Sequence, residues 1–172
     1  MPAPHEILAR LEGLNGFITA ATSVDTQVAF DWIEDCKRII KRGAANRSST
    51  NWEFAYLNDI DEDTDVIADG AATLYGLLFD FGDVSTMEDG RFIIRNVTSA
   101  FAYDATAALA TTDRLSLWIP ANAVTAVSEY HAYTFGTGIP FSVGMTAGCE
   151  DEDGSSYGAE ALGAWFLYTD DS

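Results

Sequence analysis

Two acidic runs contain the side chains of this 172-residue chain whose type and spacing best suit chemistry. The aspartates at alternate positions are Asp59, Asp61, Asp63 and Asp65 in the first run and Asp151 and Asp153 in the second. Such carboxylates can converge on a hard cation, since Ca²⁺ takes roughly six to eight oxygen ligands. The first run departs from the EF-hand pattern, because Thr64 and Gly70 stand where that loop needs glycine and glutamate. We interpret both runs as solvated acidic loops, with calcium sites as the alternative and no other cofactor.

Histidine and cysteine are too scarce in the chain to define a nucleophilic site. His131 could meet Cys149 or a serine, but no Gly-x-Ser-x-Gly sequence or cysteine–histidine signature accompanies it. The chain also has no P-loop, no Gly-x-Gly-x-x-Gly run and no HExxH sequence. Cys36 and Cys149 match no metal-binding spacing. We therefore expect two buried free thiols and no enzyme.

Positive charge is concentrated in one short stretch. It consists of Lys37, Arg38, Lys41, Arg42 and Arg47. The simpler interpretation is the last turn of a helix and the loop after it. The functional interpretation is a docking point for an acidic surface, such as the body of a neighbouring copy in a head-to-tail assembly.

Net charge divides the chain into two parts. Residues 1–52 hold six acidic and six basic residues, whereas residues 53–172 hold 21 acidic residues and three arginines, so the second part carries the whole net charge of −18. This acidity excludes duplex nucleic acid and anionic membranes as partners of the main surface, because both would be repelled. It fits a saline host, where the Debye length is only roughly 3 Å at 1 M salt. An ordinary acidic protein without a salt requirement is the alternative.

Apolar periodicity predicts helices in the neutral part. A short helix is expected over 4–15, followed by a short strand over the partly β-branched run 16–22. A longer helix is expected over 25–42, with Asp25 at its start, basic residues at its end and Gly43 as its stop. A strand over 27–33 is the competing interpretation. The polar run 43–52 is the predicted boundary between the two parts.

From Trp52 onward the apolar period changes to two, which is typical of strands. Strands are predicted at 91–97, 115–119, 130–135, 141–145 and 164–168, with others near Phe54 and Leu77. Turns are predicted at Asp69-Gly, Asp89-Gly, Gly136-Thr-Gly, Gly148 and Asp153-Gly. About eight strands in this length favour a mainly β fold, an antiparallel β-sandwich or jelly-roll-like body with an N-terminal helical segment.

In size, organisation and composition, the whole chain resembles accessory virion proteins of tailed viruses, such as capsid decoration or tail components, especially those of salt-adapted hosts. The resemblance implies a structural protein that assembles in multiple copies, with itself and with other virion proteins. Residues 1–52 would form the docking segment and residues 53–172 the acidic body. No signal peptide or membrane span is recognisable, so we expect a virion location after assembly in the host cytoplasm.

The alternative function is a carbohydrate- or cell-surface-binding β-sandwich module, with or without calcium. Exposed aromatic rings would stack on sugars in such a module. The candidates are Trp52, Trp118, Tyr130 and Tyr157.

Overall fold

The computed structural model describes residues 4–20, 26–46, 51–60, 64–80, 90–101, 108–119, 130–151 and 162–172. Two helices come first, α1 (Pro4–Ala20) and α2 (Thr26–Asn46). The strands within these ranges are β1 (Asn51–Ile60), β2 (Asp65–Ala68), β3 (Ala72–Asp80), β4 (Gly90–Arg95), β5 (Asp113–Ile119), β6 (Tyr130–Phe141), β7 (Met145–Asp151) and β8 (Leu162–Asp170). The predicted mainly β fold with an N-terminal helical segment is confirmed.

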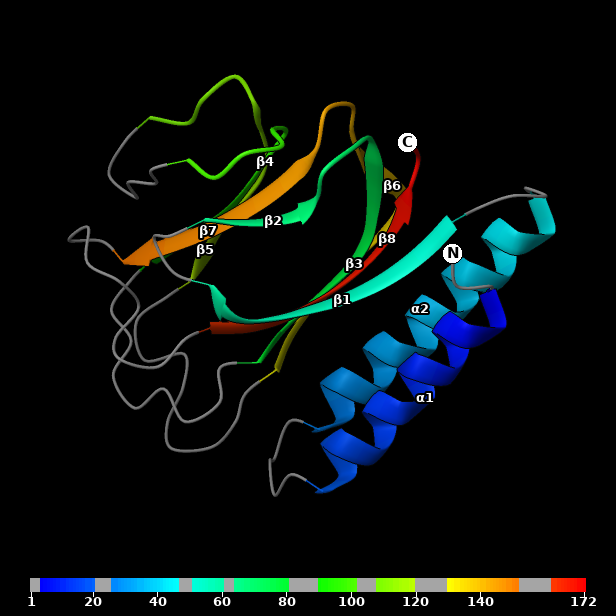
Figure 1. The fold of residues 1–172 in the computed structure, drawn as a ribbon. Helices are drawn as coiled ribbons and strands as arrows, with labels where there is room; N and C mark the ends of the chain where they lie inside the picture. The colour runs from blue at the N-terminus through cyan, green and yellow to red at the C-terminus, as the bar shows by residue number, and fades with distance from the viewer. Residues whose placement is uncertain are drawn as a thin grey trace.

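The strands form two antiparallel sheets, ordered β1-β8-β3-β6 and β2-β7-β4-β5. Each early strand pairs with a late one: β1 with β8, β2 with β7, β3 with β6, and β4 with β5. A long hairpin that folds over on itself produces this nested pairing, which is the strand arrangement of an eight-stranded jelly roll. Figure 1 shows the sheet of β2 and β7 on one side of the body and β1, β3 and β8 on the other.

The core between the two sheets is filled by aromatic side chains. Phe79, Phe92, Phe141 and Phe166 are each at most 1% exposed. The rings of Phe79 and Phe92 meet edge to face, with centroids 4.9 Å apart. Because side chains alternate between the two faces of a strand, alternate residues along each strand point into this core.

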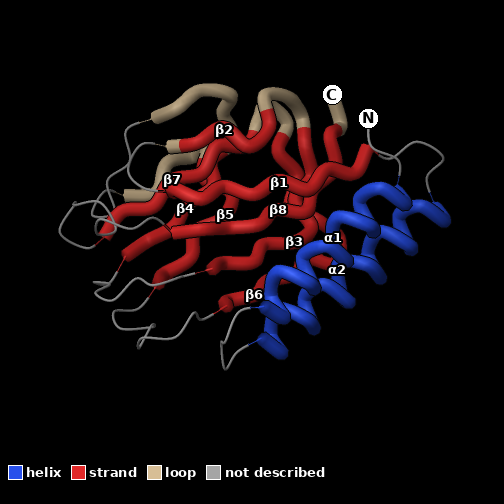
Figure 2. Tube along the Cα trace, turned by 60° about the horizontal axis from the view of Figure 1, so that its bottom comes forward, coloured by secondary structure: helices blue, strands red, loops and turns tan. Residues whose placement is uncertain are grey.

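A second core lies between the helices and the outer face of the sheet β1-β8-β3-β6. Helices α1 and α2 lie side by side on this face (Figures 1 and 2), with α1 against β1 and α2 against β3 and β6. Trp32 and Cys36 of α2 pack here with Trp165 and Leu167 of β8. Strand β8 is therefore covered on both faces, which explains why its sequence is apolar almost throughout.

Gly76 of β3 allows α2 to lie close to the sheet. A Cβ at this position would lie 3.0 Å from Cys36 Sγ and 3.1 Å from Trp32 Cζ2. Beside it, the indole Nε1 of Trp32 donates a hydrogen bond to the carbonyl oxygen of Tyr133 in β6, at 3.0 Å. The sheet is irregular at this point, because the register of β3 shifts against both of its neighbours just before Gly76.

Two sequence predictions in the helical part are wrong. The run 16–22 was expected as a strand, but α1 continues through it to Ala20; extending a helix that has already formed is favoured over starting a new element. Gly43 was expected to end the second helix, but α2 continues to Asn46. An added Cβ on Gly43 would lie 2.6 Å from Trp52 Cζ2, so this glycine makes room for the buried indole.

Three turn and strand predictions in the β-body are also wrong. The Gly136-Thr-Gly run lies inside β6, where residues 135–138 have no register partner and Gly138 adopts a φ of 77° that glycine tolerates. Gly148 lies inside β7, which pairs with strands on both sides. The predicted strand 141–145 is broken by a turn, because the side chain of Asn96 accepts hydrogen bonds from the N–H groups of Val143 and Gly144.

Candidate functional site

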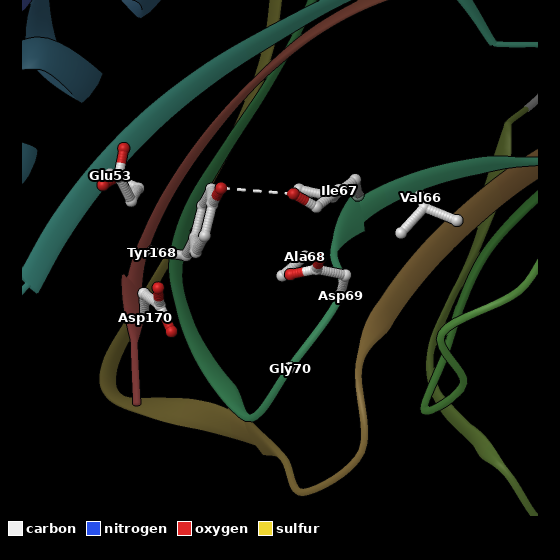
Figure 3. Close-up of a pocket in the computed structure, with 8 residues that line it drawn as sticks. All are labelled: Glu53, Val66, Ile67, Ala68, Asp69, Gly70, Tyr168 and Asp170. Atoms are coloured by element: carbon white, nitrogen blue, oxygen red, sulfur yellow. Dashed lines mark hydrogen bonds between the residues drawn. The ribbon is translucent and has the colours of Figure 1, made fainter. Parts of the chain in front are cut away.

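A cavity of about 350 Å³ lies between β8 and the turn that joins β2 to β3 (Figure 3). Glu53 of β1, Asp69 of the turn, and Tyr168 and Asp170 of β8 line it. The Tyr168 hydroxyl donates a hydrogen bond to the carbonyl oxygen of Ile67, at 3.2 Å. We call this cavity the anionic recess, because three carboxylates surround one phenol.

The electrostatics of the anionic recess favour cations over anions. Burial, and then the nearby carboxylates of Glu53, Asp170 and Asp69, raise the pKa of Tyr168 to about 12. The phenol is therefore protonated at neutral pH. Hydrogen bonds from the hydroxyl and the backbone N–H of Ser172, at 2.5 and 3.0 Å, lower the pKa of Asp170. The recess presents negative charge and a neutral, hydrogen-bonded phenol. This arrangement suits a cationic group of a ligand or partner.

The predicted calcium ligands fall largely outside the described side chains. Asp65 is half-buried at the start of β2. The side chains of the other five are not described: Asp59, Asp61, Asp63, Asp151 and Asp153. Among the described residues, no three His, Cys, Asp or Glu side chains are grouped so that they could hold a metal ion. The calcium sites therefore stay a prediction.

Both cysteines are buried free thiols, as predicted. Cys36 belongs to the core under the helices and Cys149 to the core between the sheets. Burial raises the pKa of the Cys36 thiol well above its ordinary value, so it stays protonated and unreactive. His131 is half-buried on β6, opposite Phe79 in the neighbouring strand.

The predicted basic interface lies mainly on α2, and part of its charge is paired within the chain. Lys37 Nζ lies 2.8 Å from Glu34 Oε1 and 3.7 Å from Glu12 Oε1, so it ties α2 to α1. The hydrogen bond between Lys37 and Glu34 raises the pKa of the lysine and lowers that of the glutamate. Arg38 is paired with Asp35.

The remaining predicted cations are less constrained. Lys41 and Arg42 are exposed and form no ion pair with the described part of the chain. Arg47 lies outside the described residues. The end of α2 therefore presents at least two cations to solvent, next to the paired Arg38.

Sequence reasoning did not find the anionic recess. Its carboxylates, Glu53, Asp69 and Asp170, are far apart in the chain and come together only because β1 pairs with β8 and the β2–β3 turn lies beside β8. The Asp69-Gly turn was predicted and is present as a bend. It was the only signal near this recess, and a turn alone says nothing about which strands adjoin it.

Comparisons with known proteins identify no family. No protein-family model and no curated protein matches this sequence. Among solved structures, the chain matches the coat protein dimer of Tobacco streak virus with a TM-score of 0.29 and 12% sequence identity. The match covers 71% of this chain and 88% of the coat protein chain. A TM-score this low identifies neither the fold nor the function of the chain. In the described residues, no helix is long and apolar enough to cross a membrane.

Proposed function

We propose that this chain is a structural virion protein that assembles in multiple copies through its N-terminal part, residues 1–52. The observation that carries the proposal is the nested strand pairing of the β-body. Viral capsid domains, lectin domains and cupins use this jelly-roll architecture. Because one architecture serves several functions, the interior and the surface must decide among them.

The interior of the body supports a structural use. A jelly roll that binds a small molecule inside must keep space between its sheets. Here the facing strands fill that space with Phe79, Phe92, Phe141 and Phe166, all buried. The described interior therefore serves packing, which favours partners that bind on the surface.

The distribution of charge supports docking through the helices. The structure places the helices of the neutral part over one face of a sheet, while residues 53–172 carry the net charge of −18. Two copies would repel each other through their bodies but could approach through their helices. This is the polarity expected of a subunit that docks by one side and shows the other to solvent.

Light scattering and electron microscopy of the purified full chain, in dilute buffer and in molar salt, test the proposal. We expect oligomers or particles well above the monomer mass of 18.6 kDa. A strict monomer at every salt concentration would argue against self-assembly.

A finer proposal is a decoration or tail component from a salt-adapted host, and it rests on the size, organisation and composition of the chain. Screening of the acidic body predicts that its unfolding midpoint rises with salt. A midpoint unchanged between dilute and molar salt would remove the halophilic part of this assignment.

One observation keeps the carbohydrate-binding module as a second candidate. Trp118 of β5 is 54% exposed and could stack on a sugar ring. Trp52 and Tyr130, also predicted as sugar-stacking residues, are buried in the core under the helices, and Tyr157 lies outside the described residues. Binding on a glycan array that Trp118→Ala abolishes would favour this candidate, and a silent array would weaken it.

A further inference from the structure

The exposed face of α2 has its charges separated along the helix. The exposed positions are Gln27, Val28, Asp31, Glu34, Arg38, Lys41 and Arg42. Residues three or four positions apart lie on one face of a helix, so these side chains form a single stripe. The half-buried Asp35 borders it. Negative charge occupies the N-terminal half of the stripe and positive charge the C-terminal half.

This pattern is complementary to itself when a second helix runs in the opposite direction. In an antiparallel pair related by a two-fold axis, Asp31 would face Arg42 of the second copy and Asp35 would face Arg38. Both pairings have the same midpoint, between residues 36 and 37, so one axis satisfies them together. Asp31 and Arg42 are separated by about 16 Å along the helix, roughly twice the Debye length at physiological salt, so the two ends act as separate poles.

A cavity of about 210 Å³ between α2 and β6 adds a steric reason for this pairing. It lies along the acidic half of the stripe, where Val28, Trp32 and Ala132 provide apolar walls and Asp31 and Asp35 provide carboxylates. A long side chain with an apolar stem and a cationic head suits such a groove. In the antiparallel arrangement an arginine of the second copy would lie beside it.

We infer that two copies of this chain pair through an isologous, antiparallel α2–α2 contact, with the basic end of each α2 against the acidic groove of the other. The inference rests on the proposed self-assembly and names its elementary contact. The occupant is a second copy, because one face of α2 carries both the acidic and the basic residues that such a contact needs. The rest of the chain is strongly acidic, so contacts between two copies through that part would be repulsive. Parallel pairing would place like charges opposite each other.

Charge reversal tests the inference with two full-length variants. Asp31→Lys/Asp35→Lys makes the stripe positive and Arg38→Glu/Arg42→Glu makes it negative. Each variant alone should weaken the dimer by about a hundredfold, because like charges then face each other. An equimolar mixture should restore a dimer by sedimentation equilibrium, since every cross-pair is again opposite in charge. Circular dichroism confirms that each variant is folded.

Other outcomes would overturn the inference. If Glu53→Gln/Asp170→Asn in the anionic recess abolishes association and the α2 variants mixed together do not restore it, the basic end docks head to tail on the acidic body instead. If wild type and both α2 variants form the same oligomers, the contact lies elsewhere while the proposed assembly stands. If the wild type is a strict monomer at all salt concentrations, the α2 contact and the proposed self-assembly both fail.

Discussion

Replacing Gly76 by alanine would place a methyl group between β3 and α2. The new Cβ would lie 3.0 Å from Cys36 Sγ and 3.1 Å from Trp32 Cζ2, inside the optimal carbon contact distance of about 3.5–4.0 Å. Overpacking of this kind costs about 1–3 kcal/mol, and removing a glycine from a strand returns about 0.5–1 kcal/mol. The difference between these ranges is a loss of about 0–2.5 kcal/mol, and we expect Gly76→Ala to lower the free energy of unfolding by about 1 kcal/mol.

Urea unfolding followed by tryptophan fluorescence measures this loss, with Gly136→Ala as the matched control. No atom lies within 4 Å of a Cβ added at Gly136, in the neighbouring strand, so that variant should be as stable as the wild type or slightly more stable. Adding Cys36→Ala to Gly76→Ala removes the sulfur that the methyl group meets. The double variant should then be more stable than the sum of the single effects by at least about 0.5 kcal/mol.

Two results would refute the reasoning. One is a Gly76→Ala protein as stable as the Gly136→Ala control. The other is strict additivity of Gly76→Ala and Cys36→Ala. Either would mean that α2 does not rest against Gly76 as the structure shows.

Three further predictions concern single groups. The pKa of Tyr168 is raised to about 12 from an ordinary value near 10, so the free energy of unfolding should fall as pH rises through this interval. Urea unfolding midpoints measured at several alkaline pH values should fall less for Tyr168→Phe than for the wild type. Trp32→Phe removes the donor to the Tyr133 carbonyl oxygen and should cost about 1 kcal/mol in urea unfolding; an unchanged midpoint would show that the bond contributes nothing. Gly138→Ala should lower the thermal unfolding midpoint, because φ is 77° at this position and the new Cβ would lie 2.3 Å from Thr73 Cγ2. A midpoint at or above that of the wild type would contradict this geometry.

The sequence predicted the elements whose periodicity is strong. The amphipathic stripe of α2 and the alternation in β5 were recognisable because one face of each is more buried than the other. The short apolar runs of β4 and β8 were recognisable too, although β8 is covered on both faces. The jelly-roll class followed from the number of short strands. The pairing itself was not predictable, because β1 pairs with β8 at the other end of the chain, far beyond the reach of local patterns.

Glycines account for three of the wrong predictions. Gly43, Gly136 and Gly148 were interpreted as stops or turns, although α2, β6 and β7 continue through them. Gly43 does not end the helix; its missing side chain leaves space for Trp52. A sequence shows where the backbone has freedom, but only the tertiary structure shows whether that freedom or the missing side chain is used.

The sites were less predictable than the fold. The basic stretch was recognised, but the sequence did not show that its residues differ in role. Lys37 ties the helices together while Lys41 and Arg42 are exposed, because of the face that α2 turns toward α1. The acidic residues of the same helix face, Asp31, Glu34 and Asp35, were given no role, and only Asp25 was interpreted as a favourable helix start. Which charges of a helix can contact a partner becomes clear only when the structure shows which of its faces is buried.

The most direct test of a structural virion role is the protein composition of particles. Virus particles purified by density gradient from the source culture would be analysed by quantitative mass spectrometry. We predict that this chain copurifies with the particles in many copies, at a constant ratio to their major structural protein. Its absence from intact particles, or trace amounts that vary between preparations, would contradict the proposed function.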